Sequence, residues 1–130
     1  MDEDEDFEAL FFVECAELIE DLQGRLDALS AGDEDPETVN AAFRAVHSVK
    51  GGASAFGFES LTAFTHAFET VMDRIRSGGL AMSPELSGVL LRSADVMAAL
   101  VDAARERNEA PAERMGQVLS QLEALVGPQT

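Results

Sequence analysis

The stretch AFRAVHSVKGGASAFGF, residues 42–58, carries the clearest structural pattern in the chain. Its apolar residues recur at steps of three and four, which is the period of an α-helix that buries one face. With the residues just before it, this apolar stripe consists of Val39, Phe43, Val46, Val49, Ala53 and Phe56. The polar stripe beside it consists of Asn40, Arg44, His47, Gly51 and Ser54. Because these steps keep residues on one face, His47 is predicted to lie at the edge of the core with its ring open to water.

Apolar residues follow the same helical period through almost the whole chain, and no strand-like alternation competes with it. We predict helices over about residues 7–30, 36–56, 59–77, 84–107 and 112–126. Pro36 and Pro84 suit the first position of a helix. Short connections between long helices favour antiparallel neighbours. We therefore predict an all-α fold, an up-down four-helix bundle with an additional fifth helix at the C-terminal end.

The 130 residues suit one domain, residues 1–130, and 46% of them are hydrophobic, which is enough to form a core. The formal net charge of -16 is unevenly placed. Residues 1–37 hold 15 acidic residues and one basic residue, whereas residues 38–130 hold 10 acidic and 8 basic residues. Nucleic acid and anionic lipid should repel so acidic a chain, which argues against both as partners. The acidic segment 1–6 is predicted to be a solvated lead-in to the first helix.

The sequence indicates a cytoplasmic domain that does not enter a membrane. No stretch approaches the roughly 20 apolar residues that a spanning helix needs, and the acidic start is unlike that of a signal peptide. The single cysteine, Cys15, fits a reducing compartment. Cys15 lies on an apolar stripe with no His or Lys within one helical turn, so we expect a buried, unreactive thiol. Nothing in the surface pattern demands a dimer, so a monomer is predicted.

Two glycines follow the histidine within the same predicted helix. Lys50 lies three residues after His47, and Gly51 and Gly52 come next. Each glycine costs about 1 kcal/mol relative to alanine inside a helix, so another effect must offset the loss. One reading is close packing between helices. The other is a bare surface on which the backbone of a partner protein can approach the histidine. The spacing alone leaves both readings open.

The next predicted helix carries His66 and Glu69 on a polar stripe. If the two helices are neighbours, a carboxylate can reach the ring of His47 and fix its tautomer. A neutral imidazole with an oriented lone pair is the form that attacks a phosphoryl group. Lys50 could then neutralise charge on the phosphoryl oxygens.

Several alternatives to this chemistry remain. His47 can be an ordinary surface residue of an interaction module that docks a signalling partner without catalysis. His66 and Glu69 can be an ordinary helical pair. A metal site at His47, His66 and Glu69 is disfavoured, because the chain lacks a Glu-x-x-His pair and a second cysteine for zinc. No phosphate-binding loop or dinucleotide fingerprint is present, so the sequence predicts no metal and no cofactor bound in this domain.

Residues 42–58 resemble the phosphorylation segment of the N-terminal phosphotransfer (P1, Hpt) domain of CheA-type chemotaxis histidine kinases. The stretches FFVECAELIEDLQGRLDAL, residues 11–29, and LTAFTHAFETVMDRIRSG, residues 61–78, resemble the first and third helices of that domain. The resemblance implies that His47 accepts phosphate from ATP through a separate kinase domain. It also places Lys50, His66 and Glu69 in a hydrogen-bonded active-site network, with Glu69 as the carboxylate that orients the ring.

The resemblance also implies the partners. A histidine kinase catalytic domain would be the phosphodonor, and an Asp of a response-regulator receiver domain, CheY- or CheB-like, would be the acceptor. The chain would be no enzyme by itself but the phosphoryl carrier of a protein histidine kinase. From helical phase, we expect the receiver to dock on the exposed edges of the first two helices. The predicted partner-binding residues there are Phe12, Arg44, Gly51 and Gly52.

Overall fold

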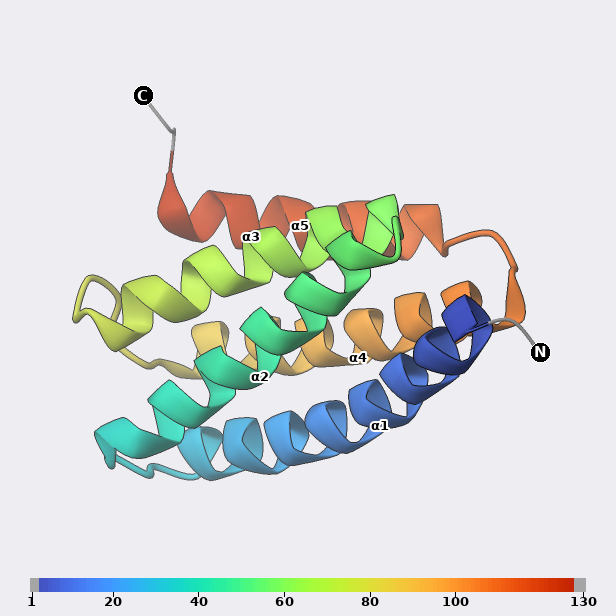
Figure 1. The fold of residues 1–130 in the computed structure, drawn as a ribbon. Coiled ribbons are helices and arrows are strands. Elements are labelled where there is room, and N and C mark those ends of the chain that lie inside the picture. Colours follow the sequence, from blue (N-terminus) through green and yellow to red (C-terminus); the bar gives the residue numbers. More distant parts are fainter. Residues whose placement is uncertain (1–2, 128–130) are drawn as a thin grey trace.

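The computed structural model describes residues 3–127 and shows helices throughout, with no strand in that range. The helices are α1 (Glu3–Ser30), α2 (Pro36–Ala55), α3 (Glu59–Arg76), α4 (Pro84–Glu106) and α5 (Ala112–Val126) (Figure 1). The predicted all-α class and the predicted order of five helices are confirmed.

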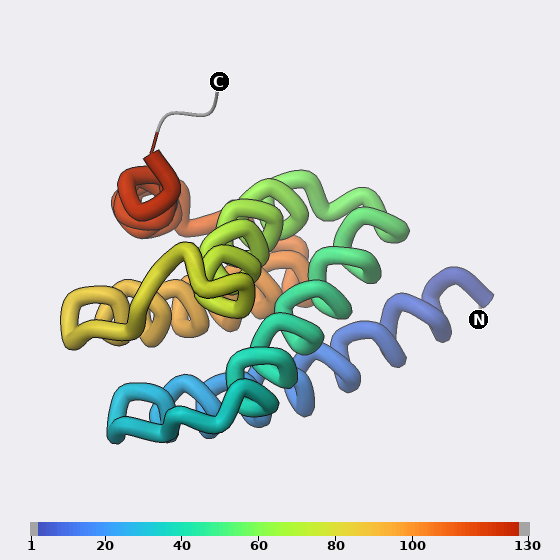
Figure 2. The backbone as a smooth tube through the Cα atoms, turned by 90° about the vertical axis from the view of Figure 1, so that its left-hand side faces the viewer, coloured from blue at the N-terminus to red at the C-terminus, as the bar shows by residue number. Residues whose placement is uncertain are grey.

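The first four helices form a closed bundle. α1 packs against α2 and α4, α2 packs against α3, and α3 packs against α4. α5 packs against α3 and α4, and the second view shows it outside the bundle beside α3 (Figure 2). This is the predicted up-down bundle with an additional C-terminal helix. α5 therefore lies away from α1 and α2, the pair that was expected to carry the docking face.

The acidic N-terminal segment differs from the prediction. α1 begins at Glu3 and not near residue 7, so residues 3–6 form the first helical turn and not a solvated lead-in. All four residues of that turn are acidic. Carboxylates stabilise the N-terminal end of a helix, where the backbone N–H groups leave a partial positive charge. The remaining part of the predicted lead-in, residues 1–2, lies outside the described residues.

Side chains cap the N-terminal ends of α2 and α4, and Pro36 and Pro84 take the first helical positions as predicted. The Asp35 side chain accepts a hydrogen bond from the backbone N–H of Glu37 at 3.0 Å, and Ser83 Oγ accepts one from Leu86 N at 3.1 Å. Each cap satisfies an N–H group that has no partner within its own helix. Between α2 and α3, Gly57 takes a φ of 77°, a left-handed conformation that favours glycine. This tight turn lays α3 back along α2, and the functional site depends on that arrangement.

One hydrophobic core runs through all five helices. Its largest fully buried side chains are Leu22, Leu26, Val46, Val49, Leu61, Phe64, Phe68, Val71, Met72, Leu90, Met97 and Leu122. Because Val46 and Val49 face this core, the stripe of α2 that carries His47 is turned outward, as predicted. Cys15 is fully buried, and burial, with a smaller effect of Glu14, raises the pKa of its thiol to about 12. Among residues 3–127, no helix has both the length and the apolar character that crossing a bilayer requires.

Candidate functional site

α2 and α3 bring three predicted site residues into direct contact. Oε2 of Glu69 lies 2.8 Å from Nδ1 of His47, and Nζ of Lys50 donates a hydrogen bond to Oε1 of Glu69, also at 2.8 Å. His47 and Lys50 lie on adjacent turns of α2, and Glu69 reaches them from α3. Both oxygens of one carboxylate are therefore used, one for the ring and one for the ammonium group.

The carboxylate is covered, whereas the ring faces water. The His47 side chain is 61% exposed, and that of Glu69 is 16% exposed. Partial burial opposes ionisation of Glu69, but hydrogen bonds from Lys50 and His47 and the charges of both groups outweigh it. The pKa of Glu69 is therefore lowered from its ordinary value. Glu69 is an anion at neutral pH and can act only as a hydrogen-bond acceptor.

The contact with Glu69 determines the tautomer of His47. Because an ionised carboxylate has no proton to give, Nδ1 of His47 must be the donor. In the neutral ring, the lone pair then lies on Nε2, the nitrogen away from Glu69. An exposed nitrogen with an oriented lone pair is a nucleophile that an electrophilic phosphorus atom can reach.

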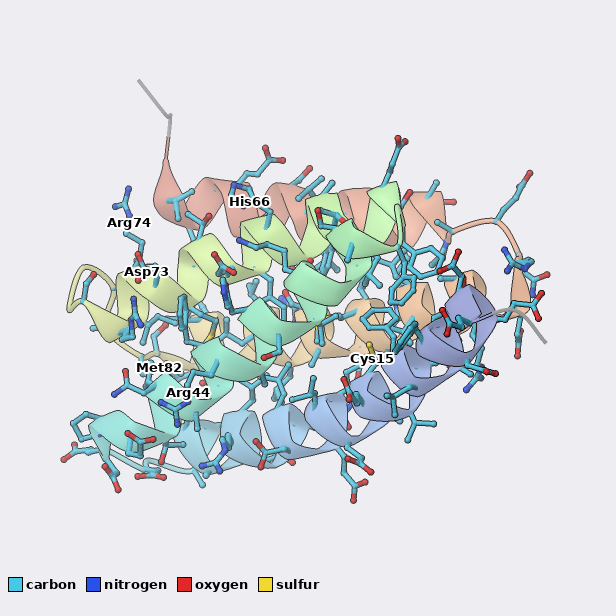
Figure 3. The ribbon with its side chains drawn as sticks, in the orientation of Figure 1. Cys15, Arg44, His66, Asp73, Arg74 and Met82 are labelled. Carbon is cyan, nitrogen blue, oxygen red and sulfur yellow. The ribbon has the colours of Figure 1, made fainter. Side chains whose placement is uncertain are left out.

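His66 does not join this hydrogen-bonded group. Its side chain is exposed, and its ring makes no hydrogen bond to any residue in the part of the chain that the structure describes. It lies on α3 (Figure 3), and it lines two grooves, one with Lys50 and Gly51 of α2 and one with residues of α5. The contact network implied by the resemblance thus contains His47, Lys50 and Glu69, with His66 at its border.

The two glycines of α2 have different surroundings. A Cβ on Gly51 would meet no atom within 4 Å, so Gly51 leaves a bare patch beside the site. A Cβ on Gly52 would lie 2.3 Å from Cε1 of Phe11, which is inside any possible van der Waals contact. Gly52 therefore serves packing between α1 and α2, and its predicted partner-binding role stays a prediction. The packing reading holds for Gly52, whereas Gly51 has the bare surface that the second reading requires, and docking of a partner there stays a prediction.

Phe12 is not on the docking face that helical phase predicted. Its side chain is only 8% exposed, and its ring lies 5.4 Å from that of Phe11 and 5.5 Å from that of Phe58, between ring centres. The helix α1 packs against both α2 and α4, so its buried face is wide enough to include two consecutive phenylalanines. Arg44 is exposed as predicted, and its guanidinium pairs with Glu37 on the same helix.

Sequence reasoning missed two residues near His47. Phe43 was assigned to the core alone, but its ring also stacks on the ring of His47. Arg76, which the prediction did not single out, places its guanidinium over the ring of Phe43. The spacing of four residues from Phe43 to His47 could have revealed the first contact, because such residues meet on a helix surface. The second contact depends on how α3 lies along α2.

No group of three or more His, Cys, Asp or Glu side chains within residues 3–127 is arranged to hold a metal ion. The functional groups that meet at the site are the imidazole of His47, the carboxylate of Glu69 and the ammonium group of Lys50. The fold and the site together define a helical bundle that presents one nucleophilic histidine to its surroundings.

Comparisons with known proteins agree with this class. The family model described as Hpt domain matches residues 7–127, and the chain belongs to this family of histidine phosphotransfer domains. It is 50% identical over 116 residues to the chemotaxis protein CheA of Rhizobium meliloti (strain 1021), covering 89% of this chain and 15% of that protein. It is 42% identical over 126 residues to CheA of Cereibacter sphaeroides, covering 94% of this chain and 18% of that protein.

A solved structure is similar over nearly the full length of both chains. It is the phosphorylated P1 domain of CheA3 in complex with CheY6 from R. sphaeroides, with a TM-score of 0.78 and 26% sequence identity. The match covers 92% of this chain and 98% of that one. By contrast, the chain spans less than a fifth of the length of the curated CheA relatives it matches.

Proposed function

We propose that this chain is a phosphoryl carrier in which Nε2 of His47 accepts the γ-phosphoryl group of ATP and passes it to an aspartate of a partner. The observation that carries the proposal is the 2.8 Å contact between Nδ1 of His47 and Oε2 of Glu69. It leaves Nε2 as the free nucleophile on a ring that is 61% exposed. The partly buried, ionised carboxylate of Glu69 at Nδ1 distinguishes His47 from an ordinary surface histidine.

The first transfer can be written with all atoms balanced. The Nε2 lone pair of His47 bonds to the γ-phosphorus, the bond from that phosphorus to the bridging oxygen breaks, and ADP leaves with the electron pair. The ring becomes positively charged, because Nδ1 still holds its proton. This positive charge develops as the bond between Nε2 and phosphorus forms. The hydrogen bond from Nδ1 to Glu69 is therefore stronger in the transition state than in the free domain.

The second transfer reverses the change on the ring. A carboxylate oxygen of the acceptor aspartate bonds to the phosphorus, and the bond from phosphorus to Nε2 breaks. The electron pair returns to Nε2, and His47 is again neutral with its proton on Nδ1 beside Glu69. Lys50 lies one turn from His47 and is 23% exposed, so its ammonium group can approach the phosphoryl oxygens in both steps.

The donor and the acceptor are proposed to be separate domains. ATP would be bound by a histidine kinase catalytic domain, and this chain itself would need no cofactor. The acceptor would be a response-regulator receiver domain. The similarity to a phosphorylated P1 domain solved in complex with CheY6 supports an acceptor of this kind. The similarity to CheA proteins supports a kinase as the donor and the cytoplasm as the compartment.

The surface around His47 suits a partner that docks briefly. Gly51 leaves open space one turn from the histidine, and Arg44 is exposed on the other side. A receiver must place its aspartate in line with Nε2, so a bare backbone near the ring lets it come close. We expect the domain to act as a monomer, with contact that is weak enough to allow release after each transfer.

Labelling with radioactive ATP tests the proposal. The chain is incubated with a chemotaxis-type kinase catalytic domain, and the wild type is compared with His47→Gln and with His66→Gln as a matched control. We expect label on the wild type and on His66→Gln but none on His47→Gln, and the label should be lost in acid and kept in base. Label that persists on His47→Gln, or none on the wild type with related kinase domains, would favour an interaction module without phosphotransfer.

A further inference from the structure

The hydrogen bond to Glu69 constrains the His47 ring at one atom only. Rotation about the last side-chain bond of histidine is broad, so a single contact at Nδ1 leaves the plane of an exposed ring poorly fixed. Transfer requires the Nε2 lone pair to point along the line of the incoming phosphorus. The ring therefore needs a second contact that sets its plane.

Phe43 provides that contact from the same helix. Its ring centre lies 6.1 Å from that of His47, and the two planes differ by 11°. This is an offset stack of nearly parallel rings, within the range in which aromatic pairs attract. Phe43 is partly buried and packs against the hydrophobic core. It therefore links the exposed ring of His47 to the rigid interior.

Arg76 holds Phe43 from α3. Its guanidinium carbon lies 3.9 Å from the centre of the Phe43 ring, the geometry of a cation–π contact. Its Nη2 donates a hydrogen bond to Asp73 Oδ1 at 2.6 Å, which fixes the guanidinium on its own helix. Glu69, Asp73 and Arg76 follow steps of four and three along α3, so they share one stripe of this helix. That stripe contacts α2 twice, at His47 through Glu69 and at Phe43 through Arg76.

We propose that Phe43 is a positioning residue that sets the plane of the His47 ring, and that Arg76 acts through Phe43. The proposal rests on the phosphotransfer function proposed above. It assigns no contact with the phosphoryl group to either residue. Loss of Phe43 should therefore slow the chemical step while leaving the binding of the kinase domain unchanged.

A double-mutant cycle tests this order of action. Labelling kinetics with a kinase catalytic domain are measured for the wild type, Phe43→Leu, Arg76→Met and the double variant. We expect kcat to fall about tenfold for Phe43→Leu and about threefold for Arg76→Met, with KM unchanged. The double variant should be no slower than Phe43→Leu alone, because Arg76 has no effect without the ring it holds. Additive losses would contradict action through Phe43.

Two control variants separate positioning from charge and from stability. Arg74→Met removes another exposed cation of the last turn of α3, one without an ion pair or ring contact among the described residues, and should leave kcat unchanged. Phe43→Tyr keeps the aromatic face and should restore the rate. If Phe43→Tyr were as slow as Phe43→Leu at equal thermal stability, a role of the ring face would be excluded.

A second measurement needs no kinase and separates this inference from the proposed function. The ¹³C relaxation order parameter of the His47 ring should fall in Phe43→Leu and Arg76→Met and stay constant in Arg74→Met. An unchanged order parameter in Phe43→Leu would overturn the positioning role. A lower order parameter in a protein that no kinase domain labels would support the positioning role and contradict the phosphotransfer function.

Discussion

The backbone of Gly52 lies directly against the ring of Phe11, so closely that a Cβ there would approach Cε1 to 2.3 Å. Phe11 is itself 7% exposed and is packed among Phe12, Phe56 and Phe58, so its ring has little room to move away. This contact sets how near α1 can come to the helix that carries the histidine. The adjacent Gly51 has no such neighbour.

The two glycines should respond in opposite ways to alanine. Gly52→Ala is expected to lower the free energy of unfolding by about 1–3 kcal/mol, because the added methyl group overpacks the contact with Phe11. Gly51→Ala is the matched control and should raise it by up to about 1 kcal/mol, because alanine favours the helix and open space receives the methyl group. Urea unfolding of both variants measures the difference. Equal effects would contradict the packing role of Gly52.

Removing the carboxylate of Glu69 should slow phosphorylation of His47 without unfolding the domain. We expect Glu69→Ala to lower the labelling rate by about 10²-fold, because the ring loses both its fixed tautomer and the stabilisation of its positive charge. Circular dichroism should show unchanged helix content. Glu59→Ala, an exposed glutamate at the start of the same helix, is the control. A normal rate in Glu69→Ala would disprove the orienting role.

The lowered pKa of Glu69 predicts a specific loss of stability in acid. A carboxyl group with a lower pKa in the folded than in the unfolded state contributes stability that is complete above its unfolded pKa. That contribution is lost as the pH falls from the ordinary value of 4.5 through the lower folded value. The free energy of unfolding should therefore decrease more steeply below pH 4.5 in the wild type than in Glu69→Gln. Parallel curves for the two proteins would show that Glu69 is not stabilised in the folded state.

Phe12 is expected to matter for stability and not for docking. Phe12→Ala should lower the free energy of unfolding by about 3–5 kcal/mol, since it leaves a cavity in a cluster of aromatic rings. Val13→Ala, at the next position and 57% exposed, should change it by less than about 0.5 kcal/mol. Chemical denaturation of the two variants gives the comparison. A small effect of Phe12→Ala would place its ring outside the core.

The sequence predicts well what depends on a single helix. The outward placement of His47 follows from the inward placement of Val46 and Val49, and the start of α2 at Pro36 follows from local chemistry. The start of α1 was missed because acidic residues suit both a solvated tail and the first turn of a helix. Composition alone does not separate these two states.

Features that depend on two or three helices were predicted less well. The periodicity of α1 indicates a buried stripe, but the width of that stripe depends on how many helices pack against α1. Because both α2 and α4 do so, Phe12 is buried as well. The pairing of Glu69 with His47 was expected only on the condition that α2 and α3 are neighbours, which the fold fulfils. The contact of Arg76 with Phe43 depends on how far α3 is shifted along α2. The spacing of residues within either helix does not determine that shift.

The tight turn at Gly57 also has a consequence for folding. It brings together side chains that are close in sequence, because Glu69 follows His47 by 22 positions and Lys50 by 19 positions. Contacts of such short sequence separation need little loop closure and form early when a chain folds. The α2–α3 hairpin contains the whole hydrogen-bonded group, so fraying of α5 would leave that group assembled. We therefore expect the hydrogen bonds of His47 and Lys50 to Glu69 to persist even when α5 detaches.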